Sequence, residues 1–194
     1  MLAAGRGVRF GGDTPKALSP LHSRPLLAYA LDAARSSGCS PVLLVVSDER
    51  VARAAGAGIE IVRNDAPERG IASSLQSALR RLEPDASVPA VVVGLADQPL
   101  VGAEAYRRIV RAHADGALLA FADYDGVRGN PVLIARPYWS EALELNGDEG
   151  ARVLFRRHAA VEVPCGDTGA AADVDTPEDL AELESRWRSP TASE

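Results

Sequence analysis

The first sixteen residues combine glycine and positive charge in a pattern that suits a phosphate chain. The stretch reads Leu2-Ala-Ala-Gly-Arg-Gly-Val-Arg-Phe-Gly-Gly-Asp-Thr-Pro-Lys16. Glycines let a backbone turn tightly and approach a ligand with its amide N–H groups turned inward. Arg9 and Lys16 add fixed and mobile positive charge, which a triphosphate would need. On composition alone, an exposed glycine turn with solvated basic side chains explains the stretch equally well.

Two acidic sites further along the chain offer ligands for a divalent cation. Asp97 follows an apolar run, and Asp175 lies just before Thr176-Pro177, which is a typical helix start. Carboxylate oxygens are the ligands that Mg²⁺ prefers, and the ion usually bridges to substrate phosphates. The structural alternative is that either carboxylate only caps or charge-stabilises the helix that follows it.

A third candidate segment is Gly70-Ile-Ala-Ser-Ser74, which opens a predicted helix. Its free N–H groups and hydroxyls could meet a nucleotide. The alternative is that Ser73 or Ser74 caps the helix, as hydroxyl side chains commonly do.

Composition limits the classes of protein that need to be considered. The chain has 194 residues, of which 46% are hydrophobic and 25% charged, as expected for one soluble domain. The net charge of −6 without basic blocks argues against nucleic-acid or membrane-surface binding. No apolar run approaches the roughly 18 residues of a membrane span. Cys39 and Cys165 match no metal-binding spacing, so we expect free thiols and a cytoplasmic protein.

Strands alternate with helices along most of the chain, which predicts an α/β fold with a doubly wound sheet. Ligands of such sheets bind beyond the carboxyl ends of the strands, where Asp97 follows its apolar run. Only four residues precede Gly5, so we expect a truncated first strand and a natural start several residues upstream. The expected helices are 26–36, 49–55, 73–82, 103–114, 138–143, 149–158 and 176–187, and the expected strands are 41–47, 59–63, 89–95, 117–121, 130–135 and 161–163.

The motifs together resemble a known family of nucleotidyltransferases. Its first loop reads L-A-A-G-x-G-x-R and then P-K, and this chain places Gly5, Gly7, Arg9, Pro15 and Lys16 at those positions. Four further segments resemble family motifs: Asp97-Gln-Pro, Arg128-Gly-Asn-Pro, Gly147-Asp-Glu-Gly-Ala-Arg and Asp173-Val-Asp. The likeness runs from residue 2 to about residue 183. By these motifs the chain resembles the MobA-like NTP transferase family, and within it the molybdenum cofactor cytidylyltransferases.

The resemblance implies a role for each matching residue. The catalytic residues would be Arg9, Lys16 and Asp97. The metal ligands would be Asp97 and Asp175, with Asp173 as the less favoured choice for the second ligand. Asn130 replaces a family histidine, which leaves it only hydrogen bonding. The implied nucleotide-binding residues are Leu2, Ala3, Ala4, Gly5, Gly7, Arg9, Lys16, Gly70, Ser73 and Ser74, and the implied acceptor-binding residues are Gln98, Arg128, Asn130, Asp148 and Arg152.

The resemblance also implies a fold and a reaction. The fold would be a Rossmann-like, mostly parallel sheet in one domain over residues 1–188, similar to the GT-A nucleotide-diphospho-sugar transferases, with a disordered tail at 189–194. The reaction would move CMP from CTP to the terminal phosphate of molybdopterin, with Mg²⁺ and release of pyrophosphate, and a molybdoenzyme could receive the product. The alternatives are GTP as donor, a different phosphorylated acceptor, or a nucleotide-binding cofactor chaperone without catalysis.

Overall fold

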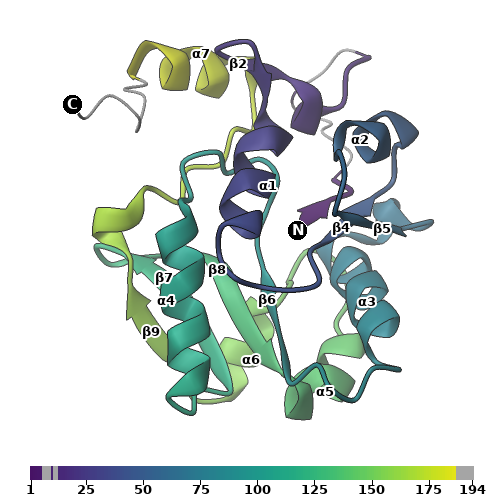
Figure 1. Cartoon of the computed structure of the whole chain (residues 1–194), viewed down its shortest axis with the longest axis vertical. Coiled ribbons are helices and arrows are strands. Elements are labelled where there is room, and N and C mark those ends of the chain that lie inside the picture. Colours follow the sequence, from purple (N-terminus) through teal and green to yellow (C-terminus); the bar gives the residue numbers. More distant parts are fainter. Residues whose placement is uncertain (6–9, 11–12, 187–194) are drawn as a thin grey trace.

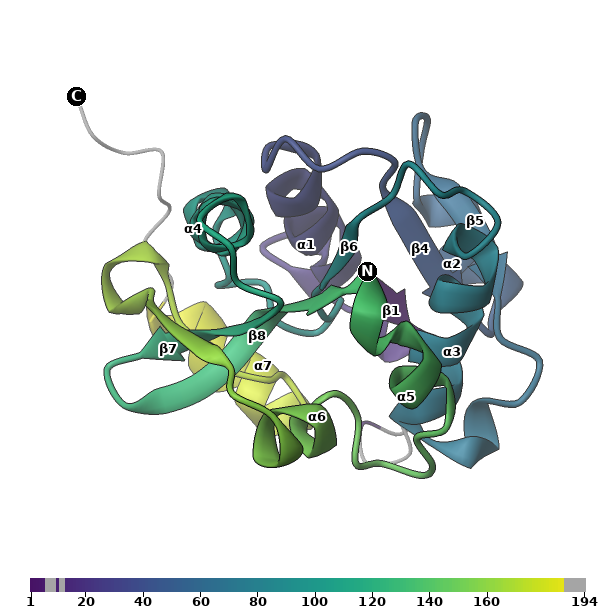
Figure 2. The same ribbon diagram turned by 90° about the horizontal axis from the view of Figure 1, so that it is seen from below.

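A twisted sheet runs through the centre of the protein (Figures 1 and 2). The computed structural model describes residues 1–5, 10 and 13–186, so the predictions on Gly7, Arg9 and the tail lie outside the described residues. The three parallel strands on one side are β1 (Leu2–Ala3), β4 (Leu43–Val46) and β5 (Glu60–Arg63), in the order β1-β4-β5. The four strands on the other side are β6 (Ala90–Val93), β8 (Val127–Ala135), β7 (Leu119–Tyr124) and β9 (Val161–Pro164), in the order β6-β8-β7-β9.

The short strand β1 joins the two halves of the sheet. Leu2 N donates to Gly94 O at 2.9 Å, and Ala96 N donates to Leu2 O at 3.0 Å, so β1 lies parallel to the end of β6. Of the seven strands in this order, only β8 runs antiparallel to its neighbours. The prediction of a mostly parallel α/β sheet in one domain with a short first strand is therefore confirmed, and that strand consists of Leu2 and Ala3.

Helices cover both faces of the sheet, and the alternating side chains of β4 show why. Leu44 and Val46 pack on one face against α1 (Leu26–Arg35) and α2 (Glu49–Ala54), whereas Leu43 and Val45 pack on the other against α3 (Ile71–Leu82). Because both faces are buried, β4 is apolar at every position. The helix α4 (Ala103–Ala114) lies beside α1, and α5 (Trp139–Leu143) and α6 (Arg152–Arg157) share the α3 face (Figure 2).

The last helix packs against residues near the start of the chain. Leu180 and Leu183 of α7 (Pro177–Arg186) contact the cluster of Leu21, Leu26 and Val174 beside a small hairpin of β2 (Pro20–Leu21) and β3 (Arg24–Pro25). That hairpin has no counterpart among the strands that we predict. Short 3₁₀ turns that we also do not predict cover Lys16–Leu18, Pro67–Arg69 and Gly166–Thr168, and another at Arg136–Tyr138 leads into α5.

The start of α3 corrects one prediction. The helix begins at Ile71, two residues earlier than expected, and Gly70 is its N-cap without a side-chain hydrogen bond. Ser73 and Ser74 therefore lie inside the first turn, and neither caps the helix. Gly70 can hold this place because its φ of +79° is a conformation that residues with a side chain rarely adopt.

Candidate active site

A cavity of about 560 Å³ opens at the carboxyl ends of β1, β4 and β6. The chain runs from β1 outward to β5 on one side and returns to β6 on the other, so the cavity lies where the strand order reverses, the usual ligand position in such sheets. The residues from our predicted site that line it are Leu2, Ala3, Ala4, Gly5, Lys16, Gly70, Ser74, Asp97, Asp148 and Asp175. Ser73, Gln98, Arg128, Asn130 and Arg152 do not line it.

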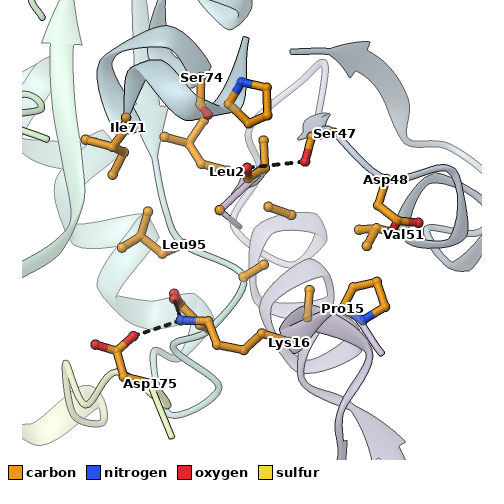
Figure 3. A pocket seen from close by; sticks show the side chains of 18 of the residues that line it. Leu2, Pro15, Lys16, Ser47, Asp48, Val51, Ile71, Ser74, Leu95 and Asp175 are labelled. Atoms are coloured by element: carbon orange, nitrogen blue, oxygen red, sulfur yellow. Dashed lines mark hydrogen bonds and ion pairs between the residues drawn. The ribbon is translucent and has the colours of Figure 1, made fainter. Parts of the chain in front are cut away.

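Three charged side chains from distant parts of the chain meet at one end of this cavity (Figure 3). Lys16 Nζ donates to Asp97 Oδ2 at 2.5 Å and to Asp175 Oδ1 at 2.9 Å. The side chains of Lys16, Asp97 and Asp175 are 15%, 22% and 34% exposed, respectively. The two carboxylates that we expect to share a metal therefore do lie together, with the expected lysine between them.

Local structure holds each member of this cluster in place. Lys16 begins a 3₁₀ turn, and Asp97 follows β6, where Asp97 O accepts from Val174 N at 3.0 Å. Thr176 and Asp179 exchange hydrogen bonds in a capping box at the start of α7, and the Asp179 carboxylate also accepts from Asp175 N. The loop that carries Asp175 is thus fixed both to the Asp97 loop and to α7.

The electrostatics of the cluster favour a bound cation. Burial of the Lys16 ammonium opposes its charge, but the nearby carboxylates of Asp97 and Asp175 outweigh burial and raise the pKa of Lys16 above its ordinary value. Burial and the charge of Asp97 raise the pKa of Asp173, although its hydrogen bond from Gln98 works in the opposite direction. Among the described residues of the cluster, three carboxylates, those of Asp97, Asp173 and Asp175, lie around one lysine.

The donor set fits a hard divalent cation. Asp97 Oδ1 is buried and accepts no hydrogen bond from any described residue, which is a costly state for a carboxylate oxygen. A magnesium-type ion bound by Asp97 and Asp175 would satisfy that oxygen. Within the described residues, no group of three or more His, Cys, Asp and Glu side chains could hold a metal. Phosphate or water oxygens would therefore have to complete the coordination.

The opposite end of the cavity is lined by the start of α3, where hydroxyl and carboxylate groups lie on the wall. Figure 3 shows Ser74 and Ile71 of α3 at this end, and Lys16 and Asp175 at the other. Ser47 Oγ donates to Ala4 O at 3.3 Å and ties the ends of β4 and β1 together. Asn64, which sequence reasoning missed, is buried behind Ser74 and donates to its hydroxyl at 3.0 Å.

Asp148 lies at this end of the cavity, although the resemblance implies that it contacts the acceptor. Its Oδ1 accepts from Ile71 N at 3.4 Å, at the start of α3. A Cβ added to Gly70 would come within 2.5 Å of Asp148 Oδ1 and of the Gly147 backbone. Gly70 thus brings the loop that carries Asp148 against α3, on the cavity wall.

The remaining acceptor residues form two groups outside the cavity. Asn130 Nδ2 donates to Gln98 Oε1 at 3.2 Å, and Gln98 Nε2 donates to Asp173 Oδ1 at 2.8 Å. The exposed Arg128 stacks its guanidinium on Phe121, with Cζ 3.9 Å from the ring centroid. Arg152 is exposed at the start of α6. The hydrogen bonds from Asn130 through Gln98 thus end at Asp173, beside the carboxylate cluster. Arg128 and Arg152 lie at the surface.

Comparison with known proteins identifies the family of this chain. Residues 1–162 match the model of the MobA-like NTP transferase domain. The nicotine blue oxidoreductase of Paenarthrobacter nicotinovorans is 32% identical over 94% of both chains. The bifunctional protein GlmU of Leifsonia xyli is 33% identical over 62% of this chain, which spans about a quarter (25%) of that longer protein.

Solved structures extend the match to the fold. Rv0371c of Mycobacterium tuberculosis H37Rv has a TM-score of 0.79 and 33% identity, with 95% of each chain covered. The same protein has also been solved in complex with manganese, with a TM-score of 0.78 and 31% identity over 96% of each chain. The fold and site define a nucleotidyltransferase of the α/β class, and the chain belongs to the MobA-like NTP transferase family. Among the described helices, none combines the length and apolar character that a membrane crossing requires.

Proposed function

We propose that this protein transfers CMP from CTP to the terminal phosphate of a molybdopterin-type acceptor and releases pyrophosphate. The observation that carries the proposal is the meeting of Lys16, Asp97 and Asp175 at one end of a nucleotide-sized cavity at the sheet edge. The choice of CTP and of the pterin acceptor rests on the Asp97-Gln-Pro, Arg128-Gly-Asn-Pro and Gly147-Asp-Glu-Gly-Ala-Arg segments.

The chain's own residues would act by position and charge. The phosphates of CTP would lie at the Lys16 end, where the ammonium would leave the carboxylates and stabilise the negative charge that builds up on the leaving pyrophosphate. Backbone amides after β1 would contact the same phosphates, with Arg9 as a further expected cation. An acceptor phosphate is already anionic near neutral pH, so no general base is needed, and catalysis is mainly alignment of the two reactants.

The family resemblance also implies Mg²⁺, and Asp97 and Asp175 would hold it. When bound, the ion would polarise the phosphoryl group that is transferred. The manganese complex of Rv0371c supports a divalent cation in a relative. In this chain, Asp97 Oδ1 supports one, because it is buried without a hydrogen bond from the described residues.

A pyrophosphate-release assay tests the proposal. The protein is incubated with Mg²⁺, molybdopterin and CTP, GTP, ATP or UTP in turn, and pyrophosphate is measured for each nucleotide. We expect release with CTP that depends on the acceptor. Release with GTP alone would move the protein to the guanylyl branch. Tight nucleotide binding without any release would favour a cofactor chaperone.

A second candidate function is suggested by the relative that matches along nearly its whole length. That protein carries the name of an oxidoreductase, and an oxidoreductase of this fold could use the same cavity for the nucleotide part of a nicotinamide cofactor. The two candidates separate in one experiment, since a reductase would oxidise NADH or NADPH in the presence of a dye acceptor. A transferase would leave the reduced cofactor unchanged and would release pyrophosphate from CTP.

A further inference from the structure

Arg50 lines the cavity, although it belongs to none of the motifs and takes no part in the proposed reaction. It is the second residue of α2, and its backbone N–H donates to Oδ1 of Asp48, the N-cap of that helix, at 2.7 Å. Its guanidinium contacts both oxygens of the same carboxylate, with Nε at 3.1 and 3.2 Å and Nη2 at 2.7 Å. Because a guanidinium is planar and rigid, these contacts hold it in one orientation.

The remaining nitrogen of the guanidinium contacts the segment that leads into Lys16. Arg50 Nη1 donates to Asp13 O at 2.5 Å. Only Thr14 and Pro15 separate Asp13 from Lys16, and the proline ring fixes the φ of Pro15, which is −55°. Few free backbone torsions therefore lie between the contact with Arg50 and the lysine, so a fixed Asp13 restricts where the Lys16 backbone can lie.

The chain on the other side of Lys16 is also held by α2. Ala17 is buried and shares a hydrophobic cluster with Val51, the residue after Arg50. Figure 3 shows Val51 next to Pro15, with the Lys16 side chain extending away from them. Two consecutive residues of α2 thus hold the chain before and after Lys16.

The charge around Arg50 makes it a poor ligand for a phosphate. Its side chain is 53% exposed and pairs with the carboxylate of Asp48, so its positive charge is already offset by a neighbour. The hydrogen bond from Arg50 lowers the pKa of Asp48 below its ordinary value, which keeps that carboxylate charged. A nucleotide phosphate at Arg50 would therefore also meet a fixed negative charge.

We propose that Arg50 is a positioning residue, which holds Asp13 through its backbone oxygen and so keeps Lys16 in place between Asp97 and Asp175. The effect of this positioning on turnover rests on the proposed function, whereas its effect on Lys16 does not. Arg50 itself touches no reacting atom and acts only through the lysine.

Nuclear magnetic resonance of the whole protein tests the positioning directly. Lys16 is the only lysine of the chain, so protein made with ¹³C-labelled lysine shows a single lysine Cε signal, whose relaxation measures the mobility of that side chain. Arg50→Gln should increase this mobility, because Asp13 is released. Arg53→Gln is the matched control and should leave it unchanged, since Arg53 lies on the same helix, is 74% exposed and pairs with Glu49.

Asp48→Asn provides a second variant with an intact helix start. Asparagine is as good an N-cap as aspartate, so α2 should begin at the same residue. The charge that orients the Arg50 guanidinium is lost, and the mobility of Lys16 should increase in the same direction as in Arg50→Gln.

Turnover tests whether Arg50 acts through Lys16. Arg50→Gln should lower the rate of pyrophosphate release by about tenfold, as for loss of one hydrogen bond. In a Lys16→Ala background, Arg50→Gln should cause no further loss, because the side chain that it positions is gone. A direct contact between Arg50 and the substrate would instead lower the rate in both backgrounds.

The outcomes separate this inference from the proposed function. Equal mobility of Lys16 in the wild type, Arg50→Gln and Asp48→Asn would overturn the inference and leave the transferase proposal standing. A further loss of rate from Arg50→Gln in the Lys16→Ala background would also overturn it, because Arg50 would then act by another route. Wild-type protein without pyrophosphate release would overturn the proposed function, and increased mobility of Lys16 in Arg50→Gln but not in Arg53→Gln would still support the positioning.

Discussion

The ammonium of Lys16 occupies the space between two carboxylates that a divalent cation would also use. The ammonium donates to one oxygen of each of the two carboxylates, Asp97 and Asp175. A cation entering the cluster would therefore compete with the lysine until phosphate groups draw the ammonium away. This exchange couples metal binding to nucleotide binding through one side chain.

That competition predicts an unusual effect of Lys16→Ala. Without nucleotide, the variant should bind Mn²⁺ about tenfold more tightly than the wild type, because a competing positive charge is gone. Titration followed by the electron spin resonance signal of free Mn²⁺ measures this affinity. Asp97→Ala, which removes a proposed ligand, should bind more weakly. Equal affinities in wild type and Lys16→Ala would show that lysine and metal do not share the carboxylates.

The same lysine should be needed for turnover. We expect Lys16→Ala and Asp97→Asn each to lower the rate of pyrophosphate release by about 10²-fold or more, as for loss of one preorganised electrostatic contact. Thermal denaturation shows whether each variant remains folded. A folded variant with the wild-type rate would remove that residue from the mechanism.

At the scale of elements, the site depends on how α3 begins. Gly70→Ala should place a methyl group against the Gly147 backbone and Asp148, in a conformation that disfavours any side chain. We expect a loss of about 3 kcal/mol in the free energy of unfolding, together with weaker CTP binding. Gly38 is the matched control, because its φ is also positive (+88°) but an added Cβ meets no atom within 4 Å. Equal effects of Gly70→Ala and Gly38→Ala on unfolding and on CTP affinity would refute the tight contact.

The contacts of Glu141 on α5 with Arg157 and His158 predict how the stability of the fold depends on pH in the acid range. Glu141 accepts from Arg157 Nη1 at 2.9 Å and contacts His158 Nε2 at 2.6 Å, and these two partners lower the pKa of Glu141 below its ordinary value of 4.5. A carboxyl whose pKa is lower in the folded state stabilises the fold above about pH 4.5 and loses that contribution as the pH falls below it. In Glu141→Gln, Tm should therefore decrease less steeply as the pH is lowered below about 4.5. Glu144→Gln should keep the wild-type slope. An unchanged slope in Glu141→Gln would contradict this assignment.

For the whole molecule, sequence reasoning recovered the larger elements because their signals are local. The apolar run of β4 and the amphipathic stripe of α4 each lie within one short segment, so their periodicity shows in the sequence. The β2–β3 hairpin has only two residues in each strand, too few for an alternating pattern to appear. The sequence predicts the start of α3 two residues too late, because its N-cap is a glycine and provides no side-chain signal.

The sequence predicts site residues only where the residue is charged and belongs to a recognisable motif. Lys16, Asp97 and Asp175 stand out as charged residues within recognisable motifs, and they do meet. Asn64 carries no such mark, since its partners on α3 become neighbours only when β5 and α3 pack together. The roles of Arg9, Arg128 and Arg152, the CTP and pterin specificity, the domain boundary at residue 188 and the cytoplasmic location stay predictions.

The central claim is that Asp97 and Asp175 share a divalent cation with the triphosphate of a bound nucleotide. Anomalous diffraction from crystals grown with Mn²⁺ and a non-hydrolysable CTP analogue tests it most directly. The account predicts one manganese peak in contact with both carboxylates and the triphosphate, with Lys16 Nζ moved onto a phosphate oxygen. A peak away from these carboxylates, or a bound triphosphate with Lys16 still bridging Asp97 and Asp175, would contradict it.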